Sequence, residues 1–181
     1  MESRTTDIAA PAPGGATNDR ADERKILVGG LLLGIGFGGF FDGIVLHQIL
    51  QWHHLLSATG DHPVNTVAGL EANTLADGLF HAFTFVASLA GLFVVWSALG
   101  RGVAIAGRQL AGMMLTGWGA FNLVEGLVDH QVLTIHHVNP ENVVLWDVAI
   151  LALGAGLVVG GMALARSGRA TVEGGRPLGD A

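Results

Sequence analysis

Residues 42–54 read DGIVLHQILQWHH and residues 125–137 read EGLVDHQVLTIHH, so one pattern occurs twice at an offset of 83 positions. An acid, Asp42 or Glu125, opens each copy, and identical H-Q and H-H pairs follow at the same spacing. A weaker match, the pattern E-x3-L-x-D, ends at Asp77 and again at Asp147. This self-similarity predicts that the chain is built from one structural unit used twice.

Each copy of the pattern lies at the end of a long apolar stretch. Crossing the roughly 30 Å hydrocarbon core of a bilayer takes about 20 apolar residues in a helix. The sequence predicts four such spans, at about residues 26–50, 77–99, 109–128 and 143–165. We therefore expect an all-α membrane protein, a four-transmembrane-helix bundle of two tandem hairpins. Two spans per unit give both copies the same orientation, with a pseudo-twofold axis along the membrane normal.

The composition supports this class of protein and excludes several others. Half of the residues are hydrophobic and only 13% are charged, against about 25% in average globular chains. The absence of cysteine excludes disulfides, thiolate metal sites and cysteine nucleophiles. A net charge of -6 argues against a nucleic-acid partner. The partner that this composition indicates is the lipid bilayer.

The positions of the basic residues predict the orientation in the membrane. All nine Lys and Arg residues fall in the N-terminal stretch, the middle loop or the C-terminal stretch. The positive-inside rule places these three segments in the cytoplasm and the two histidine-bearing loops at the outer face. We expect a disordered tail at 1–24, a membrane domain at 25–165 with repeats at 25–100 and 108–165, and a tail at 166–181. No cleaved signal peptide is expected.

Helical spacing predicts that ionisable side chains gather at the outer face. His47 and His130 continue stripes of small residues, which mark close helix contacts in membranes. Asp42 and Glu125 lie about 7.5 Å deeper, roughly aligned with His53 and His136. Ionisable groups inside a membrane are costly, and their default interpretation is functional. The predicted site comprises His47, His53, His54, His81, His130, His136 and His137, with Asp42, Asp77, Glu125 and Asp147.

Simpler interpretations remain for some of these residues. His62 lies in a polar loop and is interpreted as a solvated histidine. For His53 and His136, metal ligation and a snorkelling interfacial role are equally open. Asp147 either belongs to the site or caps a helix, and a hydrogen-bonded network without metal is the main alternative for the other histidines.

The chemistry of these side chains points to a metal ion. Imidazole suits copper, zinc, iron and nickel, and a carboxylate often orients a ligating imidazole through its other N–H group. Ferritin-like bundles use Glu and His in a related way. However, no E-x-x-H pair occurs in this chain.

Three segments, GFFDGIVLHQILQWHHLL, DGLFHAF and EGLVDHQVLTIHH, carry a resemblance to a known family. Over about residues 25–165, the chain resembles a family of predicted bacterial four-span membrane proteins that is catalogued as a domain of unknown function. The resemblance implies an integral protein of the bacterial inner membrane. Genes of that family sometimes accompany factors for copper delivery and oxidase assembly, which favours copper over zinc or iron and implies respiratory or metal-delivery partners.

Three functions remain open from the sequence. The first is metal binding at the outer face, for metal handling or respiratory-enzyme assembly. The second is a membrane oxidoreductase with a dinuclear metal centre or a b-type haem held by His47 and His130. Haem is less favoured because extra histidines and acids crowd the site. The third is a proton-coupled transporter or sensor, although the polar groups cluster at one end. Enzymatic activity and homo-oligomerisation are left open.

Overall fold

The structure is a computed structural model that describes residues 15–101, 103 and 105–174. Every element in these ranges is helical, so the all-α prediction is confirmed. The elements are α1 (Gly15–Phe41), η1 (Asp42–Ile49), α2 (Val67–Leu99), α3 (Gly107–Glu125), η2 (Gly126–Val132) and α4 (Val143–Gly174). Helix α1 begins inside the predicted tail 1–24, and α4 ends inside the predicted tail 166–181. The rest of these tails, 1–14 and 175–181, lies outside the described residues.

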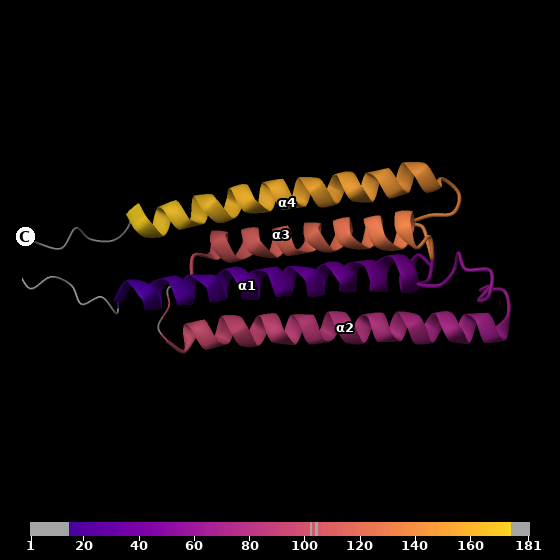
Figure 1. Cartoon of the computed structure of the whole chain (residues 1–181), viewed down its shortest axis with the longest axis horizontal. Helices are drawn as coiled ribbons and strands as arrows, with labels where there is room; N and C mark the ends of the chain where they lie inside the picture. The colour runs from indigo at the N-terminus through magenta and orange to yellow at the C-terminus, as the bar shows by residue number, and fades with distance from the viewer. Residues whose placement is uncertain (1–14, 102, 104, 175–181) are drawn as a thin grey trace, which may run out of the picture.

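The four long helices lie side by side in the order α4, α3, α1, α2 (Figure 1). Helix α1 packs against α2 and α3, and α3 packs against α4. Within the described residues, the outer helices α2 and α4 do not contact each other. The fold is therefore a row of two hairpins joined through α1 and α3, rather than a ring around one enclosed core.

Glycines allow the two central helices to approach closely. A Cβ atom at Gly34 would collide with the carbonyl of Met114, and one at Gly117 would collide with the carbonyl of Leu31. These two glycines are 83 positions apart, so equivalent residues of the two copies make the central contact. Small residues at such crossings supply the van der Waals packing that holds helices together in lipid.

Three helical segments are long and apolar enough to cross a membrane: Glu23–Ile49, Val67–Leu99 and Val143–Gly168. Helix α3 is not apolar enough to join them, although its place in the row is central. Its polar side chains, including Gln109, Thr116 and Asn122, are buried against neighbouring helices. The polar character of α3 therefore accompanies its position between two neighbouring helices, α1 and α4.

Helix α2 begins earlier than the sequence suggested. It starts at Val67, ten residues before the predicted boundary at Asp77, and it takes up part of the stretch between the first two predicted spans. Thr66 caps it, since its side chain accepts a hydrogen bond from the Gly69 N–H group at 3.1 Å. The predicted span at residues 77–99 therefore covers only the more apolar part of helix α2.

The duplication is visible in the backbone as well as in the sequence. Helices α1 and α3 both continue into π-helical segments, η1 and η2. At their ends, the Leu50 N–H group donates to the Val45 carbonyl, and the Leu133 N–H group donates to the Val128 carbonyl, both at 2.8 Å. Next, Gln51 and Thr134 take positive φ angles of 51° and 49°. All three features recur at an offset of 83.

The central glycine contact gives a first prediction. Replacing Gly117 with Ala should lower the free energy of unfolding in detergent by about 1–3 kcal/mol, because the new Cβ has no space. The control is Gly156→Ala, since a Cβ there meets nothing within 4 Å. That control should be neutral or stabilising by up to about 1 kcal/mol. Equal unfolding curves for both variants would contradict the proposed close approach.

Candidate metal centre

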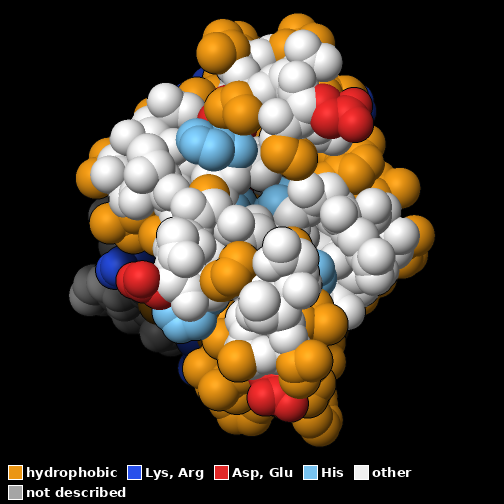
Figure 2. Space-filling model, turned by 90° about the vertical axis from the view of Figure 1, so that its right-hand side faces the viewer, with side chains coloured by type: hydrophobic (Ala, Val, Ile, Leu, Met, Phe, Trp, Pro, Cys, Tyr) orange, Lys and Arg blue, Asp and Glu red, His pale blue; other side chains and the backbone are white. Residues whose placement is uncertain are grey.

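The histidine-bearing loops meet at one end of the row, where Figure 2 shows histidine side chains gathered on the end face. The π-helical segments place the first of them. In an α-helix, residues five positions apart point in widely different directions because each residue turns by about 100°. The wider π-turn pairs residue i with i+5. As a result, His47 Nε2 lies 3.1 Å from Asp42 Oδ2, and His130 Nε2 lies 2.8 Å from Glu125 Oε1.

Asp77 organises the first half of the site from helix α2. Its Oδ1 atom lies 3.0 Å from His47 Nδ1 and accepts a hydrogen bond from the Leu55 N–H group at 2.9 Å. Its Oδ2 atom accepts from His54 Nδ1 at 2.7 Å and from Gln48 Nε2 at 3.3 Å. One buried carboxylate therefore fixes the π-turn, the following loop and the return helix relative to one another.

Asp147 performs the same task in the second half from helix α4. Its Oδ1 atom lies 3.2 Å from His130 Nδ1 and accepts from the Val138 N–H group at 3.1 Å. Its Oδ2 atom accepts from His137 Nδ1 at 2.8 Å and from Gln131 Nε2 at 3.2 Å. Each contact has its counterpart around Asp77, so the two halves share one design.

His53 and His136 cross between the two halves. His53 Nδ1 donates to the carbonyl of Val138 at 2.9 Å, and His136 Nδ1 donates to the carbonyl of Leu55 at 3.2 Å. Their rings stack with centroids 4.8 Å apart and planes 6° apart. Since Leu55 and Val138 are equivalent positions, this exchange is reciprocal, and the stacked rings mark the junction of the two repeats.

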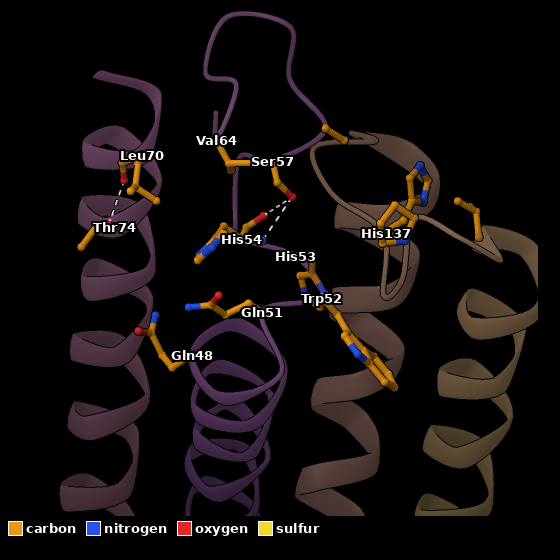
Figure 3. Close-up of a pocket in the computed structure, with 13 residues that line it drawn as sticks. Gln48, Gln51, Trp52, His53, His54, Ser57, Val64, Leu70, Thr74 and His137 are labelled. Carbon is orange, nitrogen blue, oxygen red and sulfur yellow. Dashed lines mark hydrogen bonds between the residues drawn. The ribbon is translucent and has the colours of Figure 1, made fainter. Parts of the chain in front are cut away.

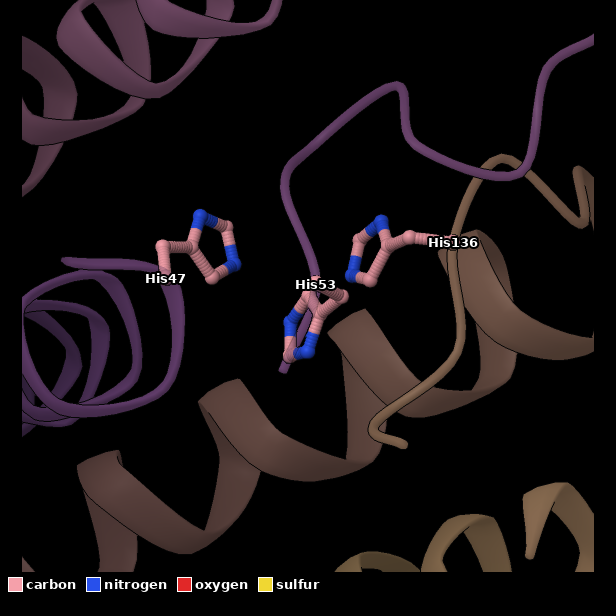
Figure 4. A group of neighbouring side chains, drawn as sticks. All are labelled: His47, His53 and His136. Atoms are coloured by element: carbon pink, nitrogen blue, oxygen red, sulfur yellow. The ribbon is translucent and has the colours of Figure 1, made fainter. Parts of the chain in front are cut away.

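Six side chains form what we call the central cluster: Asp42, His47, His53, Glu125, His130 and His136. One ring nitrogen each of His47, His53 and His136 lies within 4.8 Å of the others (Figure 4). Donor atoms of Glu125, His130 and His136 form a second such group. The two groups overlap at His136.

Several nitrogens of the central cluster have no hydrogen-bond partner. The Nε2 atoms of His47, His53 and His130 and the Nδ1 atom of His130 are buried and lack one. For His47 and His130 this holds although carboxylate oxygens lie 2.8–3.2 Å away. His136 Nε2 bonds Glu125 Oε1 at 2.8 Å. Burial, followed by the neighbouring His47 and His136, lowers the pKa of His53 to about 3. A neutral His53 whose Nδ1 carries the proton presents an Nε2 lone pair toward the cluster.

The remaining predicted residues lie around the central cluster rather than in it. His54 and His137 are half-buried and bind the outer oxygens of Asp77 and Asp147. His81 packs between Phe40 and Phe80 with a buried, unpartnered Nε2. Among the described residues, His81 joins neither group of converging donors. His62 lies in the loop, where its Nδ1 atom is 3.4 Å from the Thr59 hydroxyl oxygen.

Some supporting residues are not among the predicted site residues. Gln48 and Gln131 hold the organising carboxylates, and the signal for them was their identity in both copies. Asn73 is buried on α2; it accepts from the Leu56 N–H group at 3.0 Å and donates to the His62 carbonyl at 2.9 Å. It thereby fixes the loop, a role that requires knowledge of how the loop folds back.

The helices and the composition define a membrane protein with a buried histidine–carboxylate cluster at one end. The chain belongs to the family described as "Predicted membrane protein (DUF2243)", whose model matches residues 29–168. The family resemblance inferred from the repeated motifs is thus confirmed. No curated protein and no solved structure matches the chain.

The organising carboxylates give a second prediction. Replacing Asp77 with Ala should lower the free energy of unfolding by about 3–5 kcal/mol, because two imidazoles and a backbone N–H group lose a buried partner. The control, Glu71→Ala, removes an exposed carboxylate from the same helix and should change it by at most about 0.5 kcal/mol. The measurement is detergent unfolding followed by circular dichroism. Similar losses in both variants would contradict the role given to Asp77.

Proposed function

We propose that this protein spans the bacterial inner membrane four times and binds a transition-metal ion in the central cluster. Copper is favoured, with zinc or iron as alternatives, and the role is metal handling or assembly of a respiratory enzyme. The observation that carries the proposal is that the two ring nitrogens of each central histidine face different groups. Each Nδ1 of the four central histidines faces a carboxylate or carbonyl oxygen, while the other ring nitrogens face the cluster.

Histidines at metal sites usually have one ring nitrogen on the metal and the other hydrogen-bonded to the protein. A ligating histidine commonly donates its free N–H group to a carboxylate or a backbone carbonyl, which fixes the tautomer and the ring orientation. His47 and His130 face carboxylates in this way, and His53 and His136 face carbonyls. Four imidazoles and two carboxylates form a borderline donor set that suits copper, zinc or iron.

The balance of charge also supports a cation. Asp42, Asp77, Glu125 and Asp147 are all buried, with at most 8% of each residue exposed. Burying carboxylates requires compensating positive charge or protons. A divalent ion between the two halves supplies that charge where Asp42 and Glu125 approach the imidazoles.

A dinuclear oxidoreductase centre is the second candidate. The two overlapping donor groups, which share His136, support it, and a pair of metal ions activates water or oxygen in other enzymes. A haem held by His47 and His130 is less well supported. The rings of His53 and His136 each contact both of these histidines, so they occupy the intervening space. A transporter or sensor is also less well supported, because the polar groups are concentrated at one end of the helices.

The fourth span and the orientation belong to the same proposal. The connection between α2 and α3 lies at the same end as the described start of α1 and end of α4, opposite the histidine loops (Figure 1). Arg101 and Arg108 flank that connection. The positive-inside rule then places this end in the cytoplasm and the central cluster at the outer face.

The proposed metal site can be tested by measuring the metal content of the purified protein with elemental analysis. Protein purified in detergent should contain stoichiometric metal, and paired replacement of His47 and His130 with Gln should remove most of it. The matched control is His62→Gln, which changes a histidine outside the central cluster and should keep the metal. Electron paramagnetic resonance distinguishes Cu(II) from zinc. A wild-type preparation that holds no metal and binds none tightly would overturn the proposal.

The orientation predicts which positions react from outside the cell. Because the chain has no cysteine, single cysteines can be introduced at the exposed positions Gly60, Gly107 and Glu141. An impermeant maleimide should label Gly60→Cys and Glu141→Cys in intact spheroplasts, and Gly107→Cys only after permeabilisation. Labelling of Glu141→Cys and Gly107→Cys from the same side would show that α3 does not cross.

A further inference from the structure

A cavity of about 750 Å³ lies beside the central cluster, at the loop end (Figure 3). Its wall includes residues from both repeats, among them Gln51, His54 and Thr74 from the first and His137 from the second. His53 also lines this cavity and belongs to the central cluster. The cavity therefore adjoins the central cluster through at least one shared ligand candidate.

His54 and His137 are held in this wall in equivalent ways. The Nδ1 atom of each donates to an organising carboxylate, at 2.7 Å for Asp77 and 2.8 Å for Asp147. The opposite ring nitrogen, Nε2, is thereby left as the atom that is free to bind a ligand. The two histidines keep 15% and 27% of their side chains exposed, whereas His47 and His130 keep 1%.

We propose that His54 and His137 form a capture site for metal on its way into the central cluster. This inference rests on the proposed metal-binding function and adds a route to it. A divalent ion exchanges one of its waters for a neutral imidazole Nε2 in the cavity, without a change in oxidation state. It then exchanges that imidazole for the central nitrogens, beginning with His53, and the capturing histidine returns to its neutral, anchored form.

The anchoring carboxylates connect the cavity histidines to the central cluster. Asp77 binds His47 through Oδ1 and His54 through Oδ2, and Asp147 binds His130 and His137 in the same way. Each carboxylate therefore touches one cavity histidine and one central histidine. Partial exposure and a single free nitrogen suit a weak, exchangeable ligand, and the four buried imidazoles of the central cluster suit the final holder.

Metal-loading kinetics test the capture site. Metal-free protein in detergent is mixed with glycine-buffered Cu²⁺, and the Cu(II) absorption is followed by stopped flow, with the final stoichiometry measured by elemental analysis. Replacing both His54 and His137 with Gln should slow loading by about tenfold or more, because the local concentration of metal is lost. The final stoichiometry should not change. His62→Gln is the matched control and should load within about twofold of the wild-type rate.

The outcomes separate this inference from the proposed function. Loading of the double variant at the wild-type rate would overturn the capture site and leave metal binding intact. Loss of stoichiometric metal in the double variant would overturn it as well, since the two histidines would then be permanent ligands. Failure of the wild-type protein to take up copper, zinc or iron would overturn the proposed function itself. Circular dichroism of each variant establishes that it is folded, and Asn replaces Gln where it is not.

Discussion

Pairing between buried carboxylates and imidazoles is the constraint on which the rest of this structure depends. An unpaired carboxylate in a low-dielectric environment is prohibitively costly, and removing one partner of a buried pair is strongly destabilising. Asp77 and Asp147 each bind two imidazoles and one loop N–H group, so each ties a return helix to the helix and loop that precede it. The hydrogen bonds from His53 to the Val138 carbonyl and from His136 to the Leu55 carbonyl then connect the two halves.

The sequence predicted the repeat, the helical class and the set of ionisable residues, because all three depend on identity and spacing along the chain. It did not predict the row of helices, since the order α4, α3, α1, α2 follows from which glycine faces meet. It also favoured His54 and His137 over His53 and His136 as ligands, whereas the structure brings His53 and His136 into the groups of converging donors. Helical spacing cannot be extended past Ile49, where η1 ends and Gln51 turns the backbone to a positive φ angle. That turn brings His53 inward and leaves His54 in the cavity wall.

The two halves are similar without being identical, and one difference within the central cluster is a single methylene group, Asp42 against Glu125. Glu125 reaches both His130 and His136 at 2.8 Å, whereas the shorter Asp42 lies near His47, at 3.1 Å. His53 Nε2 is consequently left without a partner, while His136 Nε2 has one. The repeated motif supplies each half with three equivalent imidazoles, and the change from Asp42 to Glu125 makes their surroundings unequal. Two metal ions in such a site would have different donor atoms, so the two metal positions of a dinuclear centre would not be equivalent.

The position of the central cluster links the fold to the proposed chemistry. The cost of ionisable groups falls toward the membrane surface, and the cluster lies at the loop end, where the cavity adjoins it. The four buried carboxylates require compensating positive charge. In the proposed site, a divalent ion would supply that charge and bond to Nε2 atoms that otherwise have no hydrogen-bond partner. Because the candidate ligands come from both repeats, the free energy of the proposed metal binding would also hold the two hairpins together.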